Sequence, residues 1–143
     1  PLLKVTKTTA DSEELYLIAP FICYEIAYPQ QVGEMAKNAD FLVTVSNDAW
    51  FGESLGPKQH MALAQMRSLE TRRWLLRSTN TGITALVNHH GQIVKTMMTN
   101  TRGSMAGIAE MRQGQTPYMR YGVWPLLLLS LVIVAIARYT KSV

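Results

Sequence analysis

An uncharged run near the C-terminus constrains this chain more than any other feature. Residues 122–137, GVWPLLLLSLVIVAIA, hold no charged side chain, and Tyr121, Trp124 and Tyr139 lie towards the ends of the run. A helix over 121–137 is about 26 Å long, close to the ~30 Å of a bilayer core, and terminal aromatic rings favour the headgroup layer. We therefore predict a transmembrane helix with a short basic tail over 121–143. The alternative is a buried C-terminal helix of a soluble protein.

The charges around this run predict its orientation. Arg138 and Lys141 lie in the tail, so the positive-inside rule places the tail in the cytoplasm and residues 1–120 in the periplasm or its equivalent. The sequence begins at Pro1 without a Met, an apolar signal core or a basic leader. We therefore expect it to be the C-terminal piece of a longer protein.

Composition excludes several classes of protein. The chain has 143 residues, a net charge of +4, 48% hydrophobic residues and 17% charged residues, so it is one domain at most and not a disordered chain. Lys and Arg form no stripe that could track phosphates, so no nucleic acid is expected as a partner. The single Cys23 rules out an intramolecular disulfide and a thiolate-rich zinc site. The spacing of His60, His89 and His90 does not predict a metal site either.

The apolar pattern along residues 1–120 alternates between strands and helices. Continuous apolar runs predict buried strands over 15–24 and 41–47, while helical spacing predicts helices over 29–39 and 57–73. Further strands are predicted over 74–78, 83–87, 92–97 and 105–110, with a tight turn at 88–91 in which Gly91 supplies a positive φ. This alternation predicts an α/β layer.

Cys23 lies where the first buried strand gives way to a helix. A turn there exposes a thiol, and the N–H groups of the helix start are suited to bind an oxyanion. The alternative is an inert, buried cysteine. Glu25 follows two residues later and is a candidate general base or partner for a cation, or else a solvated glutamate at a helix start.

The loop SNDAWFG, residues 46–52, follows the second buried strand at the same edge of the sheet, where α/β proteins bind ligands. Two aromatic residues in this polar loop, Trp50 and Phe51, are candidates for a substrate wall. The alternative is that both rings cap the core.

Three segments together resemble a known family. ICYEIAYPQQV is similar to the active-site segment of the carbon-nitrogen hydrolase (nitrilase) superfamily. With TVSNDAWFGESLGPKQH, RSTNTG and the apolar run after Tyr121, the whole chain resembles the membrane-bound branch that acylates lipoproteins. The resemblance implies an α/β fold, namely the C-terminal half of a nitrilase-type αββα sandwich over 1–120, followed by one transmembrane helix within 121–143.

The resemblance also implies a reaction. Cys23 would be the nucleophile of a Glu-Lys-Cys triad: it takes a fatty acyl chain from a phospholipid as a thioester and passes the chain to the α-amino group of a diacylglyceryl-cysteine on a lipoprotein. Tyr24 and Glu25 match active-site positions of the family, and the backbone N–H of Tyr24 would help hold the oxyanion. Asn47 and Trp50 match the loop beside the substrate pocket. No metal or organic cofactor is implied, and the location implied is the cell inner membrane.

Two members of that triad have no counterpart in this sequence. The glutamate and lysine of the family precede the cysteine by a long stretch, whereas only 22 residues precede Cys23, and neither Lys4 nor Lys7 matches the lysine. We therefore expect a missing N-terminal part to carry both groups, this chain alone to be inactive, and its sheet to expose an apolar face. The alternatives are a membrane-anchored amidase of the same superfamily and a non-catalytic fragment that serves as an interaction module.

Overall fold

The structure is a computed structural model that describes residues 1–9 and 12–141. Six strands form one sheet in the order β1-β2-β3-β4-β5-β6. Their bounds are β1 Leu3–Thr8, β2 Glu13–Ile22, β3 Phe41–Ser46, β4 Leu75–Thr79, β5 Ala85–Val87 and β6 Ile93–Thr96. Strands β2, β3 and β4 are parallel, and the outer pairs are antiparallel. The sheet is therefore mixed, with its parallel part in the middle.

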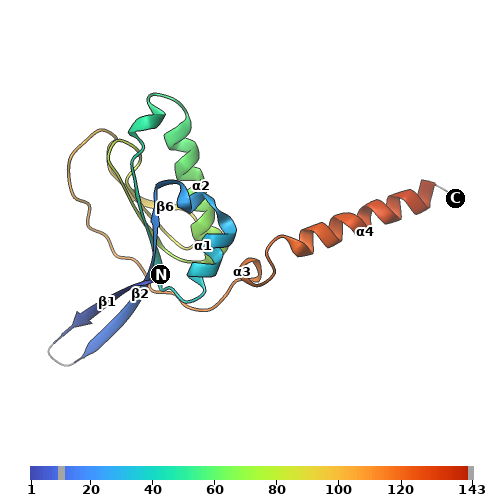
Figure 1. The fold of residues 1–143 in the computed structure, drawn as a ribbon, viewed down its shortest axis with the longest axis horizontal. Helices are drawn as coiled ribbons and strands as arrows, with labels where there is room; N and C mark the ends of the chain where they lie inside the picture. Colours follow the sequence, from blue (N-terminus) through green and yellow to red (C-terminus); the bar gives the residue numbers. More distant parts are fainter. Residues whose placement is uncertain (10–11, 142–143) are drawn as a thin grey trace.

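Two helical crossovers connect the parallel strands. The 3-10 helix η1 (Cys23–Ala27) and helix α1 (Pro29–Ala36) join β2 to β3, while η2 (Ala49–Phe51) and α2 (Gly56–Thr71) join β3 to β4. A proline lies in the first turn of α1 and of α2, where a missing N–H has no intrahelical partner to lose. Figure 1 shows α1 and α2 on one side of the sheet and the segment after β6 on the other.

The main hydrophobic core lies between these helices and the sheet. Its buried residues are Ala19, Phe21, Ile26, Val32, Ala36, Ala39, Leu42, Met61, Ala64, Leu75, Ala85, Val87 and Met119. Alternate residues of β2, β3 and β4 point to this side, as expected for the two-residue period of a strand. The core therefore fixes α1 and α2, and with them the loops at the carboxyl ends of the parallel strands.

The opposite face of the sheet is only half covered. A second buried cluster of Ile18, Phe41, Trp74 and Leu86 packs against Met105 and Ala109 of the irregular segment that follows β6. Nearer the carboxyl ends of the strands, Ile22 (66%), Val45 (50%) and Leu76 (38%) are exposed. The exposed apolar face expected from the sequence is therefore present.

Most elements match their predicted positions, and the predicted α/β class is confirmed. Strand β3, helix α2 and the hairpin turn at Gly91, whose φ is +75°, agree with the sequence pattern to within about two residues. The strand predicted over 105–110 is wrong, because that segment lies across the face of the sheet instead of pairing at its edge. Strand β1 was missing from the prediction.

The C-terminal prediction requires a correction. Helix α3 (Pro117–Tyr121) ends at Gly122, whose φ is +57°, and the separate helix α4 begins at Trp124 and ends at Lys141. Across residues 1–9 and 12–141, the structure contains no helix with the length and apolar character needed to cross a membrane. The last two residues of the predicted basic tail, Ser142 and Val143, lie outside the described residues.

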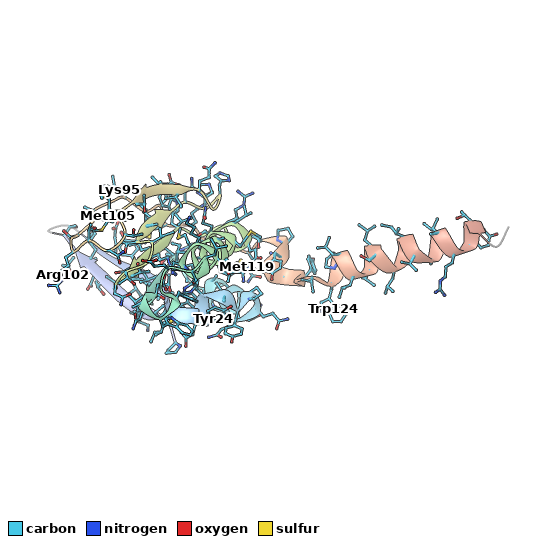
Figure 2. The ribbon with its side chains drawn as sticks, turned by 90° about the horizontal axis from the view of Figure 1, so that it is seen from above. Tyr24, Lys95, Arg102, Met105, Met119 and Trp124 are labelled. Carbon is cyan, nitrogen blue, oxygen red and sulfur yellow. The ribbon has the colours of Figure 1, made fainter. Side chains whose placement is uncertain are left out.

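Helix α4 extends away from the sheet (Figure 1), and its apolar side chains are exposed on all sides. These exposed side chains are Leu126, Leu127, Leu128, Leu129, Leu131, Val132, Ile133, Val134 and Ile136. Figure 2 shows Met119 of α3 against the body and Trp124 beyond it. The C-terminal segment therefore packs on the domain as far as α3. Beyond it, the apolar side chains of α4 named above are not covered by other parts of the described chain.

Replacing a buried leucine of the main core should lower the free energy of unfolding much more than replacing an exposed leucine. Leu42 is fully buried, whereas Leu55 is 65% exposed. We expect Leu42→Ala to lower the free energy of unfolding by about 2–5 kcal/mol because it removes buried methyl groups and leaves a cavity. Leu55→Ala should change it by less than about 0.5 kcal/mol. Urea denaturation followed by circular dichroism measures both, and equal effects would contradict this assignment of the core.

Candidate active site

The candidate active site lies at the carboxyl edge of the three parallel strands. Register pairs Ile22 of β2 with Val45 of β3, and Val45 with Ser78 of β4, so the three strands end side by side. Each strand is followed directly by a polar residue or a thiol: Cys23 after β2, Asn47 after β3 and Asn80 after β4. This edge is where open α/β sheets bind their ligands.

Cys23 occupies a strained turn between β2 and η1. Its φ is +52°, a left-handed conformation that costs a non-glycine residue about 1–3 kcal/mol and persists only where the surrounding structure enforces it. The side chain is partly exposed, and the thiol is free. Within the turn, the Ile22 N–H donates to Glu25 Oε2 at 2.8 Å. A sharp turn of this kind lifts a nucleophile out of the sheet edge towards a substrate.

A buried polar cluster lies directly beneath this turn. Asp48, His60 and Arg77 are only 1–2% exposed, and they come from the loop after β3, from α2 and from β4. Arg77 Nη2 donates to Asp48 Oδ2 at 2.8 Å, and the hydroxyl of Ser46 donates to Asp48 Oδ1 at 2.6 Å. His60 Nδ1 lies 3.0 Å from the same Oδ1. Both carboxylate oxygens are therefore satisfied without water.

The ionisation of the cluster follows from these contacts. Burial by itself raises the pKa of Asp48, but the Ser46 hydroxyl, the Arg77 charge and His60 together outweigh it, so the pKa falls below its ordinary value. Burial lowers the pKa of Arg77, opposed by the Asp48 carboxylate. Because a guanidinium stays protonated in proteins, the two groups form a buried ion pair.

The cluster also touches Cys23 at two places. His60 Nε2 lies 3.2 Å from the carbonyl oxygen of Cys23, and Ser46 Oγ lies 3.7 Å from its sulfur. Asn80 joins the same network, because its Oδ1 accepts from the backbone N–H of Asp48 at 3.0 Å. The backbone and the thiol of the candidate nucleophile are thus in contact with side chains from β3 and α2.

The residues predicted from the sequence lie around this edge in different environments. Tyr24 is exposed, and its ring centroid lies 5.6 Å from that of His60 (Tyr24 is labelled in Figure 2). Glu25 accepts the Ile22 N–H within its own turn. Asn47 is exposed at the end of β3, and its Oδ1 accepts from Asn80 Nδ2 at 2.6 Å.

Of the aromatic pair in the loop, Trp50 is exposed and Phe51 is half-buried. Trp50 is 68% exposed and stacks on Phe51 with a centroid distance of 4.8 Å, while the Phe51 ring lies 5.9 Å from that of His60. Phe51, His60 and Tyr24 therefore form a row of rings beside the Cys23 turn, and Trp50 extends the row outward.

Sequence reasoning missed the polar cluster. Its members Ser46, Asp48, His60 and Arg77 were not singled out, and His60 was considered only for metal spacing. One signal was available: His60 shares its helix face with Ala64 and Ser68, at intervals of four residues, and all three are buried. Among the described residues, no group of three or more His, Cys, Asp or Glu side chains could hold a metal ion.

A partly exposed thiol lies on a strained strand-to-helix turn at the carboxyl ends of parallel strands, which is the arrangement of an enzyme built on an α/β sheet. The carbon-nitrogen hydrolase family model matches residues 3–120. The chain therefore belongs to the carbon-nitrogen hydrolase family.

The similar curated proteins are acyltransferases. The chain is 50% identical over 111 residues to the apolipoprotein N-acyltransferase of Pseudomonas paraeruginosa, covering 78% of this chain and 22% of that protein. It is 47% identical over 116 residues to the apolipoprotein N-acyltransferase of Azotobacter vinelandii, covering 81% of this chain and 22% of that protein. The chain thus spans less than a quarter of the length of these relatives.

Solved structures share the fold. A carbon-nitrogen hydrolase from Helicobacter pylori superposes with a TM-score of 0.55 at 13% identity, over 61% of this chain and 38% of that one. The NitN amidase of a Nesterenkonia species gives a TM-score of 0.52 at 15% identity, over 82% of this chain and 45% of that one. Together with the family match, these similarities support a nitrilase-type α/β fold.

A methyl group placed against Asp48 should disturb the cluster. A Cβ added at Gly82 would lie 2.1 Å from Asp48 Oδ2, whereas a Cβ at Gly33 in α1 has no heavy atom within 4 Å. We expect Gly82→Ala to destabilise the protein by about 1–3 kcal/mol, because the held carboxylate must move. Gly33→Ala should be neutral or stabilising by up to about 1 kcal/mol because alanine favours helix. Thermal unfolding of both variants tests this, and a stable Gly82→Ala variant would contradict the geometry.

Proposed function

We propose that this chain carries the nucleophile of an N-acyltransferase that moves a fatty acyl chain from a phospholipid to the α-amino group of a diacylglyceryl-cysteine on a lipoprotein. One observation carries the proposal: the single cysteine of the sequence lies on a strained turn at the carboxyl edge of the sheet, in a chain that is 50% identical over 111 residues to an apolipoprotein N-acyltransferase. The location that fits these substrates is the inner membrane, with residues 1–120 on the periplasmic side.

In the first half-reaction, the Cys23 thiolate attacks the carbonyl carbon of a phospholipid ester. In this proposal the tetrahedral oxyanion forms beside the turn, and the backbone N–H of Tyr24 would donate to it. Collapse of the intermediate breaks the ester C–O bond and releases a lysophospholipid, whose alkoxide takes up the proton that left the thiol. The acyl chain is then held on Cys23 as a thioester.

In the second half-reaction, the free α-amino group of the lipoprotein attacks the thioester carbonyl. The C–N bond forms, the C–S bond breaks, and the proton lost by the amine returns to the sulfur. An amide and a free thiol result, so the enzyme returns to its starting state. Two half-reactions that share one covalent intermediate give ping-pong kinetics.

The proton transfers need an acid and a base at the thiol, whereas the side chain that contacts the Cys23 sulfur among residues 1–9 and 12–141 is the Ser46 hydroxyl. We propose that an upstream polypeptide supplies a glutamate and a lysine to the Cys23 edge and covers the exposed apolar face of the sheet. The exposed side chains of Ile22, Val45 and Leu76 support this arrangement, because sheets in sandwiches bury such faces against one another. Asn47 and Trp50 would border the entrance for the lipid chains.

Helix α4 supplies the lipid contact in this proposal. Its apolar side chains are exposed around the whole helix, and Trp124 and Tyr139 lie near its two ends. Exposed apolar area of this extent is unfavourable in water and favourable against hydrocarbon. A lipid bilayer would both shield this helix and deliver the acyl donor to the site.

The catalytic role of Cys23 has a direct test. The chain is incubated with phospholipid micelles together with the upstream polypeptide, and intact mass reveals an acyl adduct that neutral hydroxylamine removes. We expect Cys23→Ala to abolish both the adduct and acyl transfer, because no other thiol is present. His89→Ala should change neither the adduct nor acyl transfer, because His89 lies in the hairpin turn between β5 and β6.

The same experiment separates the alternatives. Release of free fatty acid without transfer to an amine would identify an amidase-like hydrolase. Turnover by Cys23→Ala would refute the nucleophile assignment, and the absence of an adduct in the wild type with phospholipid and with a simple activated ester alike would leave the chain as a non-catalytic module.

The lipid contact of α4 is tested by flotation with vesicles of phosphatidylethanolamine and phosphatidylglycerol. We expect the whole chain to float with the vesicles and a version ending at Tyr121 to remain behind, because the truncation removes the exposed apolar side chains of α4. Leu128→Glu combined with Val132→Glu keeps the length and should weaken flotation, since charged side chains are costly in hydrocarbon. Equal flotation of all three would contradict the assignment.

A further inference from the structure

The buried cluster beneath the Cys23 turn is larger than the fold requires. Asp48, His60 and Arg77 come from the loop after β3, from α2 and from β4, and they meet with almost no access to solvent. The partly buried Ser46 joins them from the end of β3. Burying an ion pair contributes little net stability compared with apolar residues of similar size. The cluster therefore needs a reason other than stability.

Its contacts with Cys23 supply that reason. We infer that Asp48, acting through His60 and Ser46, is the positioning residue that holds the Cys23 nucleophile in its strained conformation. The inference rests on the proposed function, and it adds roles for residues that do not themselves contact the substrate. Both links leave the same atom, Asp48 Oδ1: one leads through His60 to the Cys23 carbonyl, and the other through Ser46 to the Cys23 sulfur.

The hydrogen-bond chemistry fixes the role of His60. Its Nε2 faces the Cys23 carbonyl oxygen, which only accepts hydrogen bonds, so Nε2 carries a hydrogen and donates. Its Nδ1 lies 3.0 Å from Asp48 Oδ1 and 3.1 Å from Arg77 Nη2. When Nδ1 carries no hydrogen, it accepts from Arg77. When Nδ1 carries a hydrogen, it donates to Asp48. In both cases Nε2 keeps its hydrogen bond to the Cys23 carbonyl.

The role of Ser46 follows in the same way. A hydroxyl has one hydrogen, and the 2.6 Å contact with the charged Asp48 carboxylate takes it. Ser46 Oγ also lies 3.7 Å from the Cys23 sulfur, so the same hydroxyl touches the carboxylate and the nucleophile. The sulfur is thus held against the end of β3.

Arg77 keeps Asp48 in place. Its Nη2 holds Oδ2, so the carboxylate cannot rotate away from Oδ1 contacts with Ser46 and His60. Gly82 closes the remaining side, because a Cβ there would overlap Asp48 Oδ2. Residues of β4 and of the loop after it therefore fix the Asp48 carboxylate. Through His60 and Ser46, the fixed carboxylate holds the turn that carries Cys23.

The decisive comparison is between two replacements of His60. His60→Phe keeps a ring of similar shape but removes the donor to the Cys23 carbonyl, whereas His60→Gln keeps an N–H donor. In the chain with its upstream polypeptide, we expect His60→Phe to slow formation of the Cys23 acyl-thioester by about 10- to 100-fold, because a displaced nucleophile loses its attack geometry. His60→Gln should recover most of the rate, and KM for the phospholipid should stay unchanged in both.

His90→Phe is the matched control, because His90 is exposed in the hairpin turn. Quantitative alkylation of Cys23 by iodoacetamide, together with circular dichroism, confirms that each variant is folded with an accessible thiol. A purely structural His60 would lower the melting temperature but leave the rate per folded molecule unchanged. That result, or equal loss in His60→Phe and His60→Gln at equal stability, would overturn the inference.

Failure of the proposed function is distinguishable from failure of this inference. If the wild type forms no adduct with phospholipid, the proposed acyl donor is wrong, and the same variants are compared with p-nitrophenyl butyrate, whose carbonyl needs the same positioned thiol. A slower p-nitrophenol burst in His60→Phe, restored in His60→Gln, then supports the positioning role. An unchanged burst refutes it.

Discussion

The buried ion pair between Asp48 and Arg77 is the interaction on which the site depends. A charge enclosed by protein is tolerated only when its partner is held in good geometry, and loss of one partner from such a pair typically costs about 3–5 kcal/mol. Here the pair joins β4 to the loop after β3, while His60 joins the same carboxylate to α2. A strand, a loop and a helix are thereby held together at the edge of the sheet.

That constraint allows the strained turn to persist. Cys23 adopts a positive φ, which an isolated chain would leave, and the surrounding contacts act on its carbonyl, its sulfur and the preceding N–H. The parallel order of β2, β3 and β4 makes these contacts geometrically available, because the carboxyl ends of the three strands lie side by side. Topology places the groups together, and the ion pair fixes them.

Two apolar surfaces complete the physical description of the chain. One is the half-covered face of the sheet around Val45 and Leu76, and the other is the whole circumference of α4. The apolar area of each surface is larger than scattered apolar side chains would give. The sheet face borders the Cys23 edge, whereas α4 extends away from the sheet. In the proposed function they contact an upstream polypeptide and lipid, which brings the acyl donor and the missing proton-transfer groups to Cys23.

The sequence by itself determined most of the local structure and made Cys23 the candidate nucleophile. Apolar runs located β2 and β3, Pro57 marked the start of α2, and the position of Cys23 at a strand end was readable because periodicity and turn chemistry act over a few residues. Across residues 1–9 and 12–141 the structure has no helix suited to crossing a membrane, which corrects the predicted transmembrane helix. The strand predicted over 105–110 was wrong because the tertiary fold decides whether an apolar segment pairs at an edge or packs across a face. Only the tertiary structure showed the Asp48 cluster. Its members are separated by up to 31 positions in the sequence, from Ser46 to Arg77, and they meet because the crossovers return parallel strands to one edge. The pairing of buried charges across that distance leaves no local pattern to read.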